Sequence, residues 1–485
     1  MLTQLANEDS RLSFWLRVRE FAVPPSMIET ATARRRSGDW AGACAAAGVD
    51  VDLSLRSVAR AHGHDLAGRV RADLRRLAPD LLRWHMPRIA PDGLLRPGLT
   101  LSLARYDAAG RAGAGSVHLV ARTPPAWADA GQRISLTLWD GSRAETGACR
   151  HPHPRPNRRF RLDLHRHLWD ASRSDELRLR SGADRLAADG GPVPDPDPDP
   201  DPLGGEPGPY GRRCAVDRWA AEAEILLRAE GRHTGTVLVR LGGRQRLAVD
   251  LVADGDGHGA GGPATLRITT ASRADGASGR PMLPDAATWV TPDLELVRTG
   301  AIAADRLHPL VASSLVPDHV PTGTETGAGA RAGSSDRAGR PRLVECRGAR
   351  HRIGLVDGVL APLDHDPGEI RREELLAALT GTPLPCLRVI DEAHRRPECL
   401  TDVRERLGHG DIAGALAVVE GLLGPDALLR GGALRDELEE AARRRITYGL
   451  FRAGLIGPGP GHVRVHSDGR RAGDRRSRPR HATLG

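Results

Sequence analysis

The sequence predicts a multidomain α+β protein, with helical N- and C-terminal regions around small antiparallel-sheet units. Apolar residues recur at three- and four-residue spacing near both ends, as on the buried face of a helix. In the middle they alternate, as in half-buried strands. Two stretches poor in apolar residues separate these blocks, and 485 residues suffice for roughly two to four domains. The expected organisation is a helical region at 1–95, a small antiparallel β unit at 98–180, a Pro/Asp-rich linker at 181–212, an α+β unit at 213–320, a Gly/Ala/Ser-rich linker at 321–341, a helical domain at 342–456 and a disordered basic tail at 457–485.

The N-terminal region is expected to hold a helical hairpin and a broken amphipathic helix. The hairpin comprises Ser26–Arg36 and Asp39–Ala47, joined by a Gly-Asp turn that ends one helix and caps the next. Apolar residues at helical spacing then mark Val58–Trp84. Because Pro79 has no backbone N–H, this helix is expected to break near Leu77 and to restart.

Alternation of apolar and polar residues predicts strands in two places. In the first β unit, strands are expected at 101–106, 117–120 and 134–138, and the sheet is expected to end in Phe160–Trp169. The α+β unit is expected to contain a helix, a hairpin that turns at two glycines, and two further strands. These elements are Asp217–Glu230, then Thr236–Leu241 and Arg246–Val252 around Gly242 and Gly243, then Ala264–Thr270 and Leu294–Val297.

The C-terminal block shows start and stop signals for several helices. Asp366 is placed to cap a helix that has Pro367 in its first turn. A second helical hairpin is expected from Cys399–Leu407 and Ile412–Leu423, around another Gly-Asp turn. The final helix, Ala433–Ala453, is expected to bury one stripe, made of Leu434, Leu438, Ala442, Ile446 and Leu450.

The sequence contains no lysine, and this absence disfavours several classes of enzyme. A P-loop NTPase needs a Lys on the β- and γ-phosphates, a protein kinase needs a strand Lys, and pyridoxal or Schiff-base enzymes need a Lys amine. The net charge of +8 is uneven, since residues 457–485 carry seven Arg and two Asp. Most of the excess charge therefore lies in the tail, and the composition does not by itself imply a nucleic-acid surface.

Cysteine usage and hydropathy indicate a cytoplasmic protein. The six cysteines are scattered without the spacing of a disulfide framework, which favours reduced thiols. Residues 1–23 carry six charges and lack the apolar core of a signal peptide, and no later run reaches the length of a membrane span. We therefore expect no membrane partner.

One cluster has the donor types of a zinc site. Cys and His at alternate positions share one side of an extended chain, and two such pairs across a hairpin would give zinc four ligands. The neighbouring prolines and arginines favour the alternative, a basic loop followed by an exposed strand end. The candidate ligands are Cys149, His151, His153, His165 and His167.

A second polar group offers a Cys–His pair with an orienting carboxylate, which are the components of a nucleophilic site. The alternative is that these residues are buried thiols and surface histidines without a joint role. The group comprises Cys346, His351, Asp364, His365 and Asp366, followed by Cys386, His394 and Cys399.

Several stretches resemble known proteins. Leu387–His394 resembles motif II of DEAH-type helicases, in which Asp391 would hold magnesium and Glu392 would orient the attacking water. The lysine-bearing phosphate loop of that family is missing here. The two Gly-Asp hairpins resemble single tetratricopeptide units, without a tandem array. Asp73–Arg88 and Ala301–Pro317 resemble uncharacterised proteins of high-GC actinobacteria, which implies no activity.

No catalytic motif is complete, so the leading interpretation is a cytoplasmic multidomain interaction or accessory protein that binds a protein partner. One alternative is a metal-dependent hydrolase or metal-binding regulator, with zinc held by the cluster around Cys149. A second alternative is weak nucleic-acid binding through the arginine-rich tail, although this tail lacks interleaved aromatic residues for base stacking.

Overall fold

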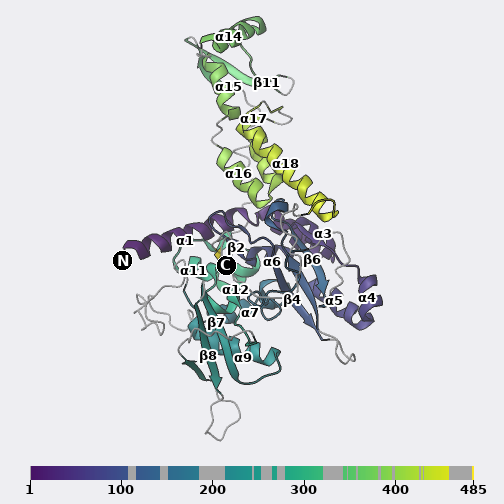
Figure 1. Cartoon of the computed structure of the whole chain (residues 1–485). Coiled ribbons are helices and arrows are strands. Elements are labelled where there is room, and N and C mark those ends of the chain that lie inside the picture. The colour runs from purple at the N-terminus through teal and green to yellow at the C-terminus, as the bar shows by residue number, and fades with distance from the viewer. Residues whose placement is uncertain are drawn as a thin grey trace, which may run out of the picture. The chain divides into compact units, whose positions relative to one another are not determined.

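The structure, a computed structural model, divides the chain into two compact units (Figure 1). The first unit comprises Met1–Trp127, Arg133–His319 and Gly457–Gly485, and the second comprises Ala128–Gln132 and Val320–Ile456. The described residues are 2–107, 116–141, 151–184, 213–242, 245–252, 265–269, 279–319, 342–346, 348–356, 359–380, 384–395, 399–424, 428–429, 431–457 and 483–484.

The chain is a multidomain α+β protein, as the sequence predicts. The linkers expected at 181–212 and 321–341 and the tail expected at 457–485 lie largely outside the described residues, so these assignments stay predictions. Within the described residues, no helix combines the length and the apolar content that a membrane crossing requires.

Helices form most of the N-terminal part of the first unit. They are α1 (Leu2–Phe21), α2 (Pro25–Arg36), α3 (Trp40–Ala46), α4 (Leu55–His62), α5 (His64–Arg76) and α6 (Pro79–His85). The carboxylate of Asp39 caps α3 by accepting a hydrogen bond of 2.8 Å from the backbone N–H of Gly42. The helix expected at Val58–Trp84 is interrupted, and Pro79 starts α6 as the rule for proline requires.

A four-stranded sheet follows these helices. Its strands are β1 (Val49–Val51), β4 (Thr100–Tyr106), β5 (Val117–Arg122) and β6 (Ile134–Trp139), in the order β1-β6-β5-β4. An antiparallel sheet with strands at the positions of β4, β5 and β6 was predicted, whereas the parallel pair β1–β6 was not. Because β1 lies between helices of the N-terminal region, that region and the sheet are parts of one structure. A smaller sheet joins β2 (Arg88–Ile89), β3 (Leu94–Leu95) and β13 (Thr483–Leu484).

The expected end of the sheet at Phe160–Trp169 is wrong. Turns and the short 3-10 helix η2 (Arg166–Leu168) occupy this stretch. The consecutive residues Leu168 and Trp169 are both buried. A strand with one face on the core would bury only every second side chain, so this segment meets the core in another conformation.

The rest of the first unit is a three-stranded antiparallel sheet, its covering helix and several short helices. They are α7 (Glu176–Ser181), α9 (Val216–Ala229), β7 (Gly235–Gly242), β8 (Gln245–Val252), β9 (Thr265–Thr269), α10 (Asp285–Thr288), α11 (Pro292–Arg298) and α12 (Pro309–Leu315). The helix and the hairpin are confirmed. The strand predicted at Leu294–Val297 is wrong. Pro292 and the acidic first turn of α11 favour a helix, and so short a segment does not by its pattern distinguish a strand from a helix.

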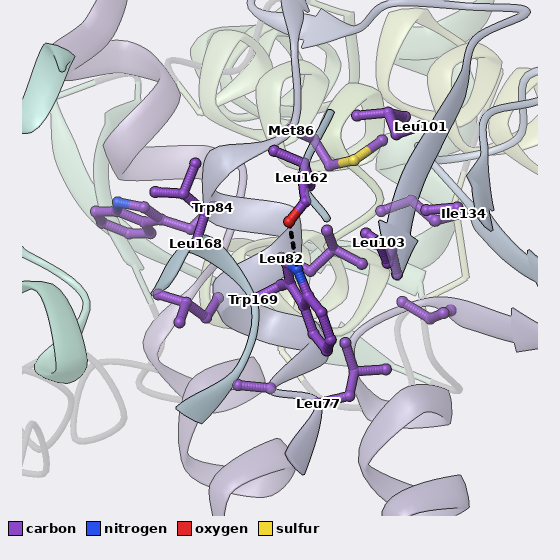
Figure 2. Packing of buried hydrophobic residues seen from close by; sticks show 14 of the residues in the cluster. Leu77, Leu82, Trp84, Met86, Leu101, Leu103, Ile134, Leu162, Leu168 and Trp169 are labelled. Atoms are coloured by element: carbon purple, nitrogen blue, oxygen red, sulfur yellow. Dashed lines mark hydrogen bonds between the residues drawn. The ribbon is translucent and has the colours of Figure 1, made fainter. Parts of the chain in front are cut away.

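One hydrophobic core unites the N-terminal helices, the four-stranded sheet and the segment around η2. Trp169 is fully buried in it, and its indole Nε1–H donates a hydrogen bond of 3.0 Å to the carbonyl oxygen of Leu162 (Figure 2). Leu82 of α6 and Leu103 of β4 belong to the same core. The side chain of Trp169 therefore lies in the core that is shared by the N-terminal helices, the four-stranded sheet and the segment around η2.

Two buried ion pairs connect α1 to α11. Arg19 donates from Nε to Oδ1 of Asp293 at 2.7 Å and from Nη2 to Oδ2 at 2.9 Å. Its guanidinium also lies over the ring of Trp84, at 4.4 Å from the centroid. Arg11 pairs with Glu295 at 2.7 Å in the same buried environment. The paired residues lie 274 and 284 positions apart in the chain.

The second unit combines a three-stranded antiparallel sheet with helices. Its elements are β10 (Arg342–Cys346), β11 (Ala349–Val356), β12 (Val359–Pro362), α14 (Pro367–Thr380), α15 (Pro385–Arg395), α16 (Leu400–His409), α17 (Ile412–Leu423) and α18 (Ala433–Arg452). The sheet was not predicted. Most side chains of β11 are exposed or half-buried, so the strand lacks the apolar alternation that marks a strand in a sequence.

The second Gly-Asp hairpin is confirmed. Asp411 caps α17 by accepting a hydrogen bond of 2.9 Å from the backbone N–H of Gly414. Asp39 and Gly42 make the same contact in the first hairpin, so both hairpins begin their second helix with the same type of aspartate cap.

The apolar stripe predicted for α18 is wrong in its second half. Leu434 is buried, but Ile446 and Leu450 are exposed. A spacing of four residues advances by more than one turn of 3.6 residues, so the stripe drifts around the helix and leaves the buried face. The residues that α18 buries are Leu434, Ala441, Tyr448 and Phe451.

Replacing Trp169 by Ala is expected to lower the unfolding free energy of the first unit by roughly 3–5 kcal/mol, because it leaves a large cavity. All eight tryptophans lie between residues 15 and 289, so urea unfolding followed by tryptophan fluorescence reports on this unit alone. The matched control is Trp127→Ala, at a tryptophan that is 40% exposed. Equal losses in the two variants would contradict the central place of Trp169.

Candidate functional site

The predicted zinc ligands occupy separate places in the first unit, and Cys149 lies outside the described residues. His151 accepts the backbone N–H of His153 at Nδ1, at 3.2 Å, and its Nε2 lies 2.9 Å from the carbonyl oxygen of Thr123. The side chain of His153 is exposed. Both ring nitrogens of His151 are therefore engaged in holding its own loop beside β5.

His165 and His167 are buried next to each other, with ring centroids 5.8 Å apart. Nε2 of His165 lies 3.2 Å from Oε2 of Glu222 in α9, and Nε of Arg180 lies 2.5 Å from Oε1 of the same carboxylate. Burial opposes the ionisation of Glu222, but His165 and Arg180 outweigh it and lower the pKa of Glu222 to about 2. This contact joins the segment around η2 to α9.

The part of the chain that the structure describes contains one group of three side chains that together suit a metal ion. It consists of Cys346, His365 and Cys386, whose donor atoms all lie within 4.8 Å of one another. Sγ of Cys386 is 3.7 Å from Nε2 of His365, and both cysteines are buried. We call these three residues the Cys/His cluster. The four described histidines from 151 to 167 form no such group, and the five-residue zinc hypothesis stays a prediction because Cys149 is not described.

Each member of the Cys/His cluster comes from a different element. Cys346 ends β10 and pairs with Ala349 across the turn to β11. His365 lies between β12 and α14, just before the residue that caps α14, Asp366, which accepts the backbone N–H of Gly368 at 3.0 Å. Cys386 follows the proline that begins α15. The tight turn and the two helix starts thus bring three donors together from far apart in the sequence.

A fourth side chain adjoins the Cys/His cluster. The ring of His351, in β11, stacks on the ring of His365 with centroids 4.1 Å apart and planes 13° apart. Its Nδ1 is buried and has no hydrogen-bond partner among the described residues. On the other side of His365, Nδ1 lies 3.7 Å from Oε2 of Glu369.

The carboxylates that a nucleophilic site would use are engaged elsewhere. Asp364 pairs with Arg352 at 2.6 Å, and this contact lowers the pKa of Asp364 to about 2. Asp366 caps α14. Burial and the neighbouring Cys346 raise the pKa of the Cys386 thiol to about 11, so the thiol is not activated for attack. The arrangement therefore lacks the free carboxylate and the low-pKa thiol of a nucleophilic site.

The other sequence candidates lie apart from this group. Cys399 packs against the core between α16 and α17, and the side chain of His394 is not described. The stretch that resembles a DEAH motif is part of α15, where Asp391 and Glu392 are exposed. In DEAH-type helicases this motif lies at the end of a strand, so its position on a helix surface here does not match that family.

The first unit contains a cavity of about 90 Å³ beside α6. His85, Arg19 and Arg159 contribute to its lining, and the two arginines pair with Asp293 and Asp285. The volume is well below the roughly 300–1,000 Å³ of common ligand pockets. The cavity is therefore too small for a typical ligand, and what matters about this region is that it buries His85 and so changes the pKa of its ring.

Helix α14 presents an apolar face to solvent. It has no buried residue, and Leu375, Leu376 and Leu379 are 65%, 50% and 85% exposed. We call these three residues the leucine face. Ile370, on the opposite side of the helix, packs against the core that contains Cys346. The leucine face was not singled out in the sequence, although leucines opposite an anchoring residue at helical spacing are a visible signal.

Comparison with known proteins gives no match: no family model fits the chain, and no curated protein or solved structure is significantly similar to it. The resemblances to tetratricopeptide units and to actinobacterial proteins stay predictions. We therefore infer function from the geometry of the Cys/His cluster and of the leucine face.

The stability of the first unit is expected to fall as the pH drops from about 6.5 to about 4. Burial lowers the pKa of His85 to about 4, although Asp293 partly opposes this effect. The folded chain then binds fewer protons than the unfolded chain, so this contribution to stability is lost with falling pH, by about 3 kcal/mol. Urea unfolding by tryptophan fluorescence at both pH values measures it. In His85→Gln the loss should be smaller by that amount, and an identical pH dependence in the variant would contradict this assignment.

Proposed function

We propose that the protein is a cytoplasmic multidomain interaction or accessory protein, and that its leucine face binds a protein partner. The observation that carries the proposal is the exposure of Leu375, Leu376 and Leu379 on one side of a helix that buries no residue. Single exposed leucines are ordinary, whereas contiguous ones mark surfaces that another molecule covers.

Covering the leucine face would supply much of the energy of a complex. Fully burying one leucine contributes roughly 1.5–3 kcal/mol. Leu379 lies three and four positions after Leu376 and Leu375, and these are separations by which an amphipathic helix enters an apolar groove. Because Ile370 anchors the opposite side, the helix is already formed, and binding does not have to order it.

Charged side chains border the leucine face and define the chemistry of the partner. Arg371, Arg372 and Glu374 are exposed on the same helix. We infer a partner with an apolar groove whose rim carries charges of both signs, since complementary charges set orientation and specificity.

The two alternatives remain open to direct tests. The metal-dependent hydrolase needs the five predicted ligands around Cys149, and zinc there stays a prediction. Nucleic-acid binding through the tail would be lost on truncation after Pro460 and would weaken steeply with added salt.

The partner can be identified and the surface tested with one set of variants. A photo-reactive amino acid placed at Leu375 should crosslink a discrete partner protein in cells, and the same probe at Leu179, an exposed leucine of α7, should not. With that partner purified, Leu376→Glu and Leu379→Glu should each weaken binding at least tenfold, which corresponds to about 1.4 kcal/mol.

The matched control for the affinity measurement is Leu179→Glu, which makes the same chemical change on a helix of the first unit. An equal loss of affinity in this control would point to a general effect of charge. A crosslink from position 375 to the first unit of the same chain would show that the leucine face is covered internally, and the proposal would then fail.

A further inference from the structure

The part of the second unit formed by β10–β12, α14 and α15 has a very small apolar core. Its buried apolar residues among those described are Cys346, Ile353, Leu384, Cys386, Leu387 and Ile390, and Val344 and Ile370 pack against the cluster around the two cysteines. Segments of this size, 342–395, seldom fold on such a core, and small natural domains add disulfides or a metal to hold themselves together. Two of these six buried residues are cysteines, and a histidine lies beside them.

We propose that Cys346, His365 and Cys386 bind one Zn²⁺ ion, with His351 as the fourth ligand. Thiolate and imidazole are the donors that structural zinc sites use, usually four of them around the ion. Calcium and magnesium require oxygen donors instead, and the three residues offer none. This inference concerns what holds the unit together, and it does not depend on the partner of the leucine face.

The spacing of the donor atoms fits the size of zinc. With Zn–S near 2.3 Å and Zn–N near 2.0–2.1 Å, tetrahedral coordination places a sulfur and a nitrogen about 3.6 Å apart. Sγ of Cys386 and Nε2 of His365 lie 3.7 Å apart. The donor atom of Cys346 lies within 4.8 Å of both, so small side-chain rotations bring all three to one ion.

The surroundings of His365 resemble the support of a metal-binding histidine. Its Nε2 faces the sulfur of Cys386, and its Nδ1 faces the carboxylate of Glu369 at 3.7 Å. This distance is longer than a hydrogen bond, so the carboxylate lies near the far nitrogen without bonding to it; in many metal sites a carboxylate at this position orients the histidine. Glu369 belongs to the first turn of α14, so the ion and this helix support the same side chain.

His351 is the side chain that we assign to the fourth position. Its ring nitrogens do not lie within 4.8 Å of all three other donor atoms, so its ring has to turn out of the stack with His365 to reach the ion. Its ring adjoins that of His365 at 4.1 Å, and in the part of the chain that the structure describes its buried Nδ1 has no hydrogen-bond partner. Burying an unsatisfied ring nitrogen is unfavourable, and coordination to the ion would remove this penalty.

Elemental analysis of the untagged, full-length protein tests the proposal. We expect one zinc per chain after growth with added zinc, and loss of that zinc in Cys346→Ser and in Cys386→Ser. The matched control is Cys399→Ser, which changes a cysteine of the same unit outside the Cys/His cluster and should keep the metal. His351→Ala should bind zinc at least roughly tenfold more weakly in competition with a chromophoric chelator.

A cobalt titration keeps the test valid if the serine variants do not fold. The reduced wild-type protein, freed of metal, should bind one Co²⁺ with the intense visible bands of a tetrahedral site and with thiolate charge-transfer absorption. Chelation of the metal should reduce the helical circular dichroism, while tryptophan fluorescence, which reports only on residues 15–289, stays unchanged.

Three results would overturn the proposal. They are wild-type protein that takes up neither zinc nor cobalt, a disulfide between Cys346 and Cys386 in freshly purified protein, and full zinc content in both serine variants. Unchanged zinc affinity in His351→Ala would overturn the assignment of the fourth ligand. Failure to find a partner for the leucine face leaves each of these measurements unaffected.

Discussion

The first unit depends on the carboxylate of Asp293. This buried anion receives Arg19 from α1, and the indole N–H of Trp84 from α6 lies 3.2 Å from its Oδ2. A buried charge is tolerated only when its partners satisfy it, so the three segments must be in place together. The same carboxylate lies 3.8 Å from Nε2 of His85, which remains neutral in the cavity beside it. One ionised group thus fixes three helices and sets the electrostatics of the interior.

The second unit is held together differently. The hairpin of α16 and α17 has a conventional apolar core with α18, whereas the sheet and α14 meet at the Cys/His cluster. Because His365 directly precedes the capping residue Asp366, the Cys/His cluster and the start of α14 share one short segment. The proposed ion would therefore fix the helix whose other side carries the leucine face. A binding surface on a small scaffold benefits from such rigidity, since a preformed helix loses less entropy when it binds.

The sequence predicted what local chemistry decides and missed what distant segments decide. Asp39 and Asp411 cap their helices as expected. Each cap is a contact between a carboxylate and the backbone N–H three residues later, so it does not depend on any distant part of the chain. The parallel strand β1 was not predicted, because a segment of three residues is too short to show the apolar alternation of a strand. For the Cys/His cluster, the sequence showed that cysteines and histidines were present but not that three of them meet. Its members, Cys346 and Cys386 with His365 between them, converge through a sheet that was itself not predicted, so spacing alone suggested a nucleophile where the geometry favours ligands.

The ion pair between Arg19 and Asp293 also has a consequence for synthesis of the chain on the ribosome. The two residues are 274 positions apart, and at about 5–20 residues per second the second emerges roughly 14 to 55 s after the first. During this interval α1 lacks the carboxylates that pair with its arginines. It also lacks the leucines of α11, which belong to the same apolar core as Trp15 and Val18. The newly made N-terminal half must therefore wait, partly uncovered, for a helix encoded almost three hundred codons later.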